Sequence, residues 1–452
     1  MKLEVKNLGA VGTATIGLSS PLTIFCGPNN TGKTYLSYLL YSIMSDAFLQ
    51  PLQVFDTLRN SLKQNQVVLE KTHLEEFLNQ HLQVVRSKFG NVFGLSDDIA
   101  EQLFKNTELK FEVSDEEWEQ MLKCSFEFRY VSNDKEVLVK KEGRNVVIEN
   151  YSEASQTIWT LIMYRLLKTT VFGKHPRPVI FPVERNSIYT FKTELSINRI
   201  SLINKIQDIK DNKETTAISM IENNSRRYPI AIRDALNIAY DVENIQKTKS
   251  KFYDFACNIE KDLLGGTLTV GKNGDVLFSS LKMKKSSQLP IHITSSIVKT
   301  LSSLIFYLKH SARQNDVIFI DEPEMNLHPD SLVVLARFFA ELVNKGFRLF
   351  ISTHSDFIVR ELNNLIMAGS IAQYNKKSLA YPSSQLIDYK DISVYYFHFK
   401  TYNSKTTTVE KVLVDKYGFD VKSMDTTIEE LNEKANNLYY ELRDYECKKE
   451  KK

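Results

Sequence analysis

The sequence is poor in cysteine, and its four cysteines are widely scattered at positions 26, 124, 257 and 447. No two of them form a C-x-x-C pair, the spacing that many zinc sites and thiol redox motifs use. A small secreted domain held together by disulfides would carry a denser set. We therefore expect reduced thiols, as in a cytoplasmic protein, with neither a disulfide framework nor a zinc site.

Long apolar runs are missing as well. No stretch approaches the roughly 20 apolar residues that a membrane-spanning helix needs. The first residues, Met1–Val5, lack the apolar core of a signal peptide. We expect a cytoplasmic protein that does not engage a membrane.

A strong charge imbalance is also absent, because 58 basic residues face 55 acidic ones and leave a net charge of +3. Such a small excess does not by itself indicate a nucleic-acid partner, so any basic patch has to be local and nucleic acid stays open as a ligand. The hydrophobic content of 42% is that of an ordinary globular protein, and 452 residues are enough for two or three cores.

The most informative stretch that is present is Gly27–Thr34, which reads GPNNTGKT and fits the phosphate-loop pattern G-x-x-x-x-G-K-[ST]. An apolar, β-leaning segment, Leu22–Cys26, precedes it, and an apolar segment without helix breakers, Tyr35–Met44, follows it. A strand, a turn and a helix start in this order aim backbone N–H groups at a polyphosphate. The predicted nucleotide contacts are Gly27, Asn29, Asn30, Thr31, Gly32, Lys33 and Thr34.

Within this loop the residue types have separate tasks. The glycines allow the backbone to approach the phosphates closely, and Asn30 is expected to supply mainly backbone geometry. Lys33 places a cation between the outer phosphates, and the hydroxyl of Thr34 is a ligand for Mg²⁺.

A second apolar strand candidate, Asp316–Ile320, ends in the acidic motif Asp321-Glu322-Pro323-Glu324. A nucleotide site needs such a pair opposite its phosphate loop, because one carboxylate holds Mg²⁺ through water and its neighbour polarises the attacking water. Together with the phosphate loop, this motif predicts an NTPase.

Four landmarks stand in the order that the ATP-binding-cassette ATPases show: the phosphate loop, a serine-led helix start at Ser295-Ser296, the Asp321-Glu322 motif, and Thr353-His354-Ser355. Within that class, the chain resembles the relatives of the chromosome-maintenance (SMC) ATPases that act in bacterial phage defence. These include the OLD-type, Gabija, Septu and PARIS ATPases, of which the PARIS ATPase subunits are the most similar.

The resemblance rests on the residues of three motifs. Asp321–Pro329 is similar to the D-E-P-E-x-x-L-H-P of these proteins, which is a specific signature, and Ile351–Ser355 is a second specific match. Phe181–Arg185 is a weaker match to a Pro-x-Glu-Arg segment. The resemblance covers the ATPase parts, about half of the chain.

The resemblance implies a role for each matching residue. Lys33 binds phosphate, while Thr34 and Asp321 hold Mg²⁺. Glu322 is the general base that orients water, and His354 is the switch residue that senses the γ-phosphate of ATP.

Ser295 or Ser296 reaches the nucleotide of a partner subunit, as the signature serine does in this class. The implied assembly is a homodimer or a higher homo-oligomer with ATP at the interface. The signature normally has glycine after the serine, whereas this chain has Ile297 after Ser296. For Arg185, a phosphate contact and a structural ion pair remain equal alternatives.

The expected fold class is α/β, an ABC-type P-loop nucleotide-binding domain with a mixed β layer, a parallel core sheet, and helical and β insertions. The expected core is discontinuous (1–45, 151–190 and 265–400), with a helical and β-meander insertion at 46–150, a helical insertion at 191–264, and a strand and helix at 401–452. The phosphate-loop strand and the Asp321 strand are expected to be neighbours in one sheet. The last helix is expected to begin at Thr426, with Glu429 completing a capping box, and to bury Leu431, Ala435, Leu438 and Leu442.

The resemblance implies an ATPase that acts as sensor and scaffold in an anti-phage module and controls a separate effector protein such as a TOPRIM nuclease. No D-x-D pair follows His354, so the chain is not expected to contain that metal-dependent nuclease itself. One alternative is a DNA-repair or chromosome-organising SMC-like ATPase that clamps DNA. A less favoured one is a transporter's nucleotide-binding subunit, which would lack the insertions and carry a clean L-S-G-G-Q.

Overall fold

The computed structural model describes residues 1–132, 135–150, 155–173, 177–190, 228–271, 274–282, 288–374, 381–399, 401, 404–421 and 430–443. Residues 191–227, the first half of the 191–264 insertion, lie outside these residues, as do Thr426 and Glu429.

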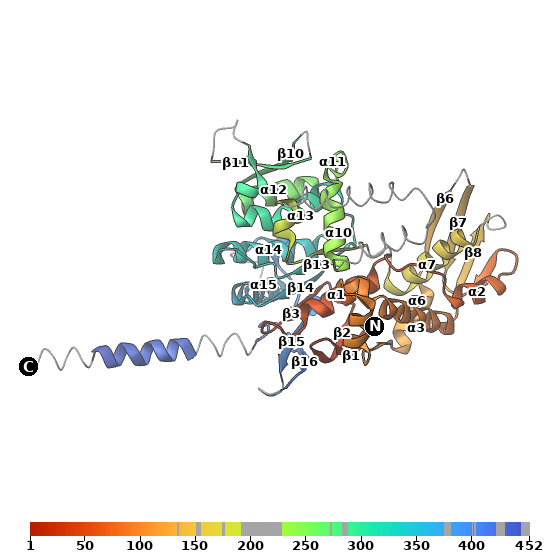
Figure 1. The fold of residues 1–452 in the computed structure, drawn as a ribbon, viewed down its shortest axis with the longest axis horizontal. Helices are drawn as coiled ribbons and strands as arrows, with labels where there is room; N and C mark the ends of the chain where they lie inside the picture. Colours follow the sequence, from red (N-terminus) through yellow and green to blue (C-terminus); the bar gives the residue numbers. More distant parts are fainter. Residues whose placement is uncertain are drawn as a thin grey trace, which may run out of the picture.

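A nine-stranded sheet organises the chain, with the strand order β5-β1-β2-β16-β15-β3-β14-β13-β9 (Figure 1). Its strands are β1 (Lys2–Leu8), β2 (Val11–Gly17), β3 (Leu22–Cys26), β5 (Glu108–Glu112), β9 (Pro178–Phe181), β13 (Val317–Asp321), β14 (Arg348–Thr353), β15 (Ile392–Phe399) and β16 (Thr407–Val412). The neighbouring strands from β15 to β9 are all parallel, whereas β5, β1 and β2 pair antiparallel. The sheet is therefore a parallel core with a mixed layer along one side, as expected.

Two features of this sheet differ from the expectation. β3 and β13 are not neighbours, because β14 lies between them and pairs in parallel with both. In addition, β5 and β16 are strands of this sheet, although the expected boundaries place residues 108–112 and 407–412 outside the core. Short-range patterns identify a strand but do not determine which strands pair, because pairing depends on contacts far apart in the sequence.

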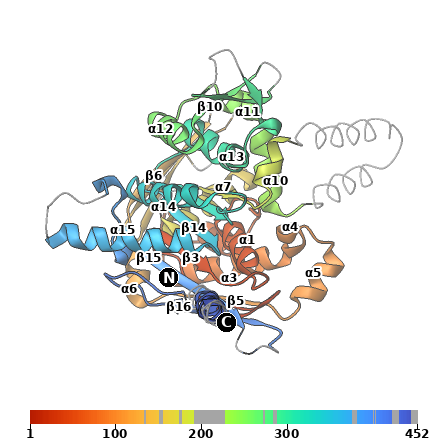
Figure 2. The same ribbon diagram turned by 90° about the vertical axis from the view of Figure 1, so that its left-hand side faces the viewer.

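Side chains alternate across the parallel strands, so the sheet divides two hydrophobic cores. Phe25, Phe319 and Phe350 point to the core that also contains α1 (Lys33–Met44), α3 (Lys71–Ser87) and α7 (Gln156–Phe172). The intervening residues, such as Ile24 and Ile318, point to the other core, which contains α12 (Tyr253–Leu264), α13 (Ser296–His310), α14 (Pro329–Asn344) and α15 (Asp356–Tyr374). Figure 2 shows α13, α14 and α15 on the side of the strands away from α3.

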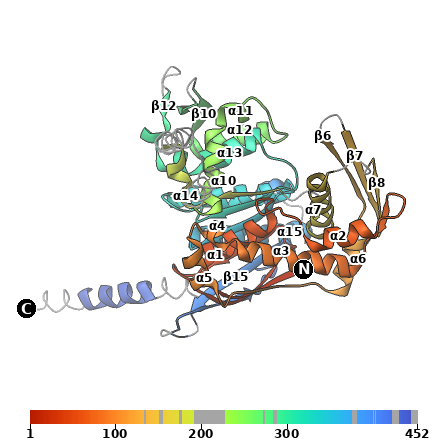
Figure 3. The ribbon, with the colours of Figure 1, turned by 45° about the vertical axis from the view of Figure 1, so that its right-hand side comes forward.

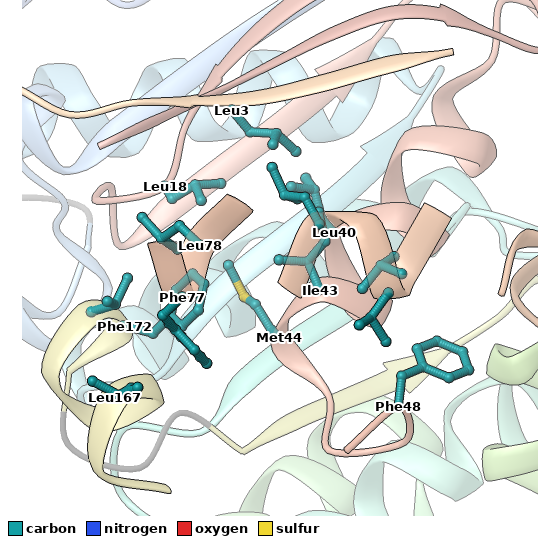
Figure 4. Packing of buried hydrophobic residues seen from close by; sticks show 14 of the residues in the cluster. Leu3, Leu18, Leu40, Ile43, Met44, Phe48, Phe77, Leu78, Leu167 and Phe172 are labelled. Carbon is teal, nitrogen blue, oxygen red and sulfur yellow. The ribbon is translucent and has the colours of Figure 1, made fainter. Parts of the chain in front are cut away.

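Helix α1 follows the phosphate loop and is buried almost throughout. Leu40, Ile43 and Met44 meet Phe77 of α3 in a close-packed apolar cluster (Figure 4). Burial of this kind fixes the helix, and with it the loop that precedes it.

The expected β-meander forms a separate four-stranded sheet, β4-β8-β7-β6. It consists of β4 (Gln66–Val68), β6 (Phe126–Ser132), β7 (Lys135–Glu142) and β8 (Asn145–Glu149), and it lies beside α7 at the far right of Figure 3. The other helices of the 46–150 insertion are α2 (Gln53–Asn60), α4 (Phe89–Phe93), α5 (Asp97–Phe104) and α6 (Asp115–Lys123), of which α4 contacts α1 and α5.

A three-stranded sheet, β10 (Gly266–Val270), β11 (Val276–Ser280) and β12 (Leu289–Pro290), lies above α12 and α13 at the top of Figure 1. β10 and β11 pair antiparallel and form a hairpin. The described remainder of the 191–264 insertion contains α10 (Ile230–Tyr240), α11 (Val242–Ile245) and α12. No helix in the described ranges is both long and apolar enough to cross a lipid bilayer.

The expectation for the last helix is wrong in one respect. Residues 430–443 are helical, but Leu431, Leu438 and Leu442 are exposed instead of buried. An amphipathic pattern shows that a helix has an apolar face, but it does not show that the same chain covers that face.

Acid should weaken the core through His81, which is buried in α3 with its Nε2 atom 2.7 Å from the carbonyl oxygen of Ile43. Burial lowers the pKa of His81 to about 4. An unfolded histidine binds a proton near pH 6.5, so the stabilisation from His81 is complete above about pH 6.5 and is lost as the pH falls towards 4. Between pH 6.5 and pH 5, the free energy of unfolding should drop by about 2 kcal/mol from this residue alone.

Urea unfolding at the two pH values measures this effect, with His81→Gln as the test variant because glutamine retains a donor for the Ile43 carbonyl but does not titrate. The exposed His292 gives the matched control, His292→Gln. An equal pH dependence in the wild type and in His81→Gln would show that His81 does not contribute.

Candidate functional site

The parallel strands bring the candidate residues to one edge of the sheet. Carboxyl ends of parallel strands meet at the same edge, and ligand sites of open α/β sheets lie there. β3 ends at the phosphate loop, β13 at Asp321, β14 just before His354, and β9 four residues before Arg185. Three of these strand ends were identified from the sequence as parts of the site, and their meeting point follows from the register of the sheet.

The phosphate loop has the backbone that its sequence predicts. Gly27 and Gly32 have φ angles of 140° and 93°, and Asn30 is left-handed at 63°. A Cβ atom at Gly27 would collide with the carbonyl oxygen of Phe397, and one at Gly32 would lie 2.6 Å from Cγ2 of Val11. Both glycines are therefore required by the fold. The expectation that Asn30 contributes backbone geometry agrees with its φ angle, since asparagine tolerates this region.

Helix α1 begins directly at this loop with Lys33. No side chain caps its N-terminus, and its first turn contains no acidic residue. The free N–H groups and the positive end of the helix dipole thus face the loop, an arrangement suited to an anion.

Lys33 is buried, and its ammonium group folds back onto the loop. Its Nζ atom donates hydrogen bonds to the carbonyl oxygens of Gly27 (2.9 Å) and Pro28 (2.8 Å). Burial lowers the pKa of Lys33, and the negative charges of Glu322 and Asp321 oppose this shift. A polyphosphate bound in the loop would be an anionic partner for the ammonium group of Lys33, in place of the two carbonyl groups.

Thr34 and Asp321 meet across a sequence separation of 287 residues, with Oγ1 of Thr34 2.9 Å from Oδ2 of Asp321. The other carboxylate oxygen of Asp321 accepts a hydrogen bond from the hydroxyl of Ser352 in β14. Burial raises the pKa of Asp321, while the hydrogen bonds from Ser352 and Thr34 act against the rise. A hydroxyl and a carboxylate side by side are a donor set that fits Mg²⁺, whose other ligands are commonly water and phosphate.

Glu322 follows directly, half-buried, with a left-handed φ angle of 44°. Its backbone N–H donates to the carbonyl oxygen of Ser352 (3.0 Å). A non-glycine residue in this region is unusual and often marks a functional position.

Glu324 is a residue to which the sequence assigned no role of its own. It is buried, and its Oε1 atom accepts hydrogen bonds from the Thr353 hydroxyl (2.9 Å) and the His354 backbone N–H (2.6 Å). The same oxygen lies 3.1 Å from Nδ1 of His354, whose side chain is 43% exposed. Glu324 thus fixes the end of β14 and orients the imidazole ring, which faces solvent at the site.

Arg185 fulfils neither of the alternatives considered for it. Its buried guanidinium donates to three main-chain carbonyl oxygens, those of Pro182 (3.0 Å), Asp321 (2.6 Å) and Glu322 (2.7 Å). Burial lowers its pKa to about 10, so it remains charged at neutral pH. Arg185 therefore holds the backbone that carries the two acidic residues.

Thr407 of β16 is another residue that the sequence did not identify. It is buried, and its hydroxyl oxygen lies 2.8 Å from the carbonyl oxygen of Thr31 and 3.1 Å from that of Ala10. The phosphate loop thus has support from a strand near the end of the chain. No local motif predicts such a contact, because threonine is common in strands and its presence does not indicate a partner.

Ser295 and Ser296 are not part of this cluster. Both are exposed at the start of α13, where Ser295 is the N-cap but its side chain makes no capping hydrogen bond. Within the described residues, no hydrogen bond joins either serine to the phosphate loop. A single chain therefore brings together the phosphate loop, the Asp321-Glu322 motif and His354, but the two serines do not join this cluster.

Comparison with known proteins agrees with this geometry. The family model described as the AAA ATPase domain matches residues 1–359. No curated protein matches the sequence.

Three solved structures of SMC heads are similar at low identity. An Smc head bound to the C-winged helix domain of ScpA is 12% identical, with 92% of this chain and 98% of that chain covered and a TM-score of 0.37. An Smc head with an extended coiled coil, bound to the C-terminal domain of ScpA and derived from Pyrococcus furiosus, is 13% identical (95% and 98% covered, TM-score 0.35). The SMC head domain from Thermotoga maritima is 12% identical (91% and 98% covered, TM-score 0.33).

The family match extends from the first strand of the sheet past Lys33, Asp321 and His354, so it includes every part of the site except Thr407. This chain belongs to the AAA ATPase domain family.

Proposed function

We propose that this chain hydrolyses ATP with Mg²⁺ at the carboxyl edge of its sheet. The observation that carries the proposal is the 2.9 Å contact between Thr34 and Asp321, because it unites the phosphate loop and the acidic motif in a single donor set. The buried Lys33 beside them adds the cation that a triphosphate needs.

Each residue has a physical task in this mechanism. The N–H groups at the start of α1 and the ammonium group of Lys33 bind the outer phosphates. Thr34 and Asp321 hold Mg²⁺, which neutralises phosphate charge when it is bound. Glu322 accepts a proton from the attacking water, and His354, held by Glu324, contacts the γ-phosphate.

Removal of the metal tests this proposal directly. Phosphate release from ATP should require Mg²⁺ and fall to background in EDTA, then return when Mg²⁺ is added in excess. Asp321→Asn should raise the Mg²⁺ concentration needed for half-maximal rate, because it removes the charged ligand. Metal-independent release of phosphate by the purified chain would contradict the proposed site.

The proposed biological role is that of a sensor and scaffold in an anti-phage module, where the ATPase controls a separate effector such as a TOPRIM nuclease. The D-E-P-E-x-x-L-H-P wording at residues 321–329 supports this assignment by its resemblance to phage-defence ATPases. Cells that express the chain with its neighbouring genes should resist phage, and Glu322→Gln should change that resistance. If both Glu322→Gln and Lys33→Ala leave phage resistance unchanged, the ATPase activity of this chain is not needed for defence.

A DNA-clamping ATPase is the second candidate, and a basic surface pocket favours it. This pocket has a volume of 570 Å³, and its lining includes Arg177, Lys249, Lys251 and Arg313 but no carboxylate. Arg177 is already paired with Asp316, so the other three cations are the ones available to a phosphate backbone.

Duplex DNA should then stimulate ATP hydrolysis several-fold at low salt, and the combined variant Lys249→Glu, Lys251→Glu should remove the stimulation without changing the basal rate. Lys299→Glu, on α13 away from this pocket, is the matched charge control. If DNA leaves hydrolysis unchanged at low salt, the DNA-clamp function is excluded.

A further inference from the structure

The helix at residues 430–443 has an apolar face that nothing in the described chain covers. Every one of these residues is exposed, including Leu431 at 61%, Leu438 at 67% and Leu442 at 59%. Figures 1 and 3 show this helix projecting away from the sheet and its covering helices. An isolated helix of this length is marginal in water, because most helical stability comes from packing of an apolar face.

The aliphatic residues form one narrow stripe, and Tyr439 and Tyr440 lie beside it. Leu431, Ala435, Leu438 and Leu442 are spaced by four, three and four residues, which matches consecutive d, a, d and a positions of a heptad repeat. A stripe of this width is typical of a two-helix seam, whereas a helix lying on a globular core usually has a broader apolar face.

The charges beside the stripe indicate what covers it. Lys434 and Glu441 occupy the same flank, one heptad apart, at the g position. When two copies of the helix pair antiparallel about a two-fold axis, Leu431 lies beside the partner's Leu442 and Ala435 lies beside the partner's Leu438. In that arrangement, Lys434 faces the partner's Glu441, and Glu441 faces the partner's Lys434.

A parallel pair would not satisfy these charges, because a g residue then faces the e residue of the next heptad, and Lys434 would face the partner's Tyr439. We infer that residues 430–443 form an antiparallel two-helix contact with a second copy of this chain. This contact does not involve the phosphate loop, because the helix lies apart from α1, which follows that loop (Figure 3).

The test uses the full chain without nucleotide and in a Lys33→Ala background, so that ATP-driven association cannot contribute. Sedimentation equilibrium over a concentration series measures self-association. Leu438→Asp should weaken it by about 100-fold or more, since each pair loses two buried leucines and would have to bury two carboxylates. Unchanged circular dichroism and melting temperature would show that the body of the protein is intact.

Charge reversal tests the orientation of the two helices. Lys434→Glu and Glu441→Lys should each weaken self-association by about 10-fold, because each turns two attractive contacts into two repulsive ones. An equal mixture of the two single variants should associate like the unmodified chain, since both contacts in the mixed pair are then attractive. The matched control is Glu433→Lys, which makes the same charge change on the outer side of the helix.

Three outcomes would overturn the inference. The first is a chain that stays monomeric without nucleotide at every concentration, and the second is self-association that Leu438→Asp leaves intact. The third is a mixture of the two charge variants that associates no better than either variant alone, because this would refute the antiparallel arrangement.

Discussion

Lys33→Ala should abolish ATP binding, whereas Glu322→Gln should keep ATP bound and stop its hydrolysis. Lys33 contacts the phosphates in the proposed complex through charge-assisted hydrogen bonds, so its loss should reduce affinity for ATP by about 100-fold or more. Glutamine has almost the shape of glutamate but cannot accept the proton of water. Turnover in Glu322→Gln should therefore fall by about 10²- to 10⁴-fold with affinity preserved.

Equilibrium binding of ATP and single-turnover phosphate release separate the two effects. Glu324→Gln is the matched control, because it makes the same chemical change two residues away in a side chain that orients His354. Its effect on turnover should be smaller than that of Glu322→Gln. If Glu322→Gln hydrolyses ATP at the wild-type rate, another acidic residue is the general base, and Glu324 is the first candidate.

Two inactive variants should restore each other's activity if ATP is shared between subunits. Lys33→Ala disables the phosphate-loop side of a site, and the combined variant Ser295→Arg, Ser296→Arg blocks the opposite side. In a dimer with ATP at its interface, which the resemblance to the ATP-binding-cassette ATPases implies, one of the two sites of a mixed pair has neither lesion. Because random mixing makes half of the dimers mixed, about a quarter of the wild-type activity should return.

The exposure of both serines at a helix start in the single chain motivates this experiment. A mixture of Lys33→Ala with Glu322→Gln is the control, since both lesions lie on the same side of the site and every mixed pair keeps one in each site. Complete inactivity of verified Lys33→Ala and double-arginine mixed dimers would mean that each site is built within a single chain.

The sequence by itself determined those parts of the site whose physical cause is local. The phosphate loop requires a strand, a glycine turn and a helix start within a few residues, so Gly27–Thr34 could be identified, and the structure has that backbone. Likewise, the apolar strand that ends in Asp321-Glu322 can be identified from its local pattern. The α/β class follows from the alternation of strands and helices.

Tertiary structure alone decided the parts that depend on pairing between distant segments. Three examples join segments far apart in the chain. β14 lies between β3 and β13, Arg185 donates hydrogen bonds to the backbone of Asp321 and Glu322, and Thr407 supports the phosphate loop. No local pattern encodes these contacts, because an arginine or a threonine finds its partner only when the sheet has set its register. The leucines at 431–442 show the same limit: the sequence defined their apolar face, but only the folded chain showed that this face lies open, since burial depends on what packs nearby.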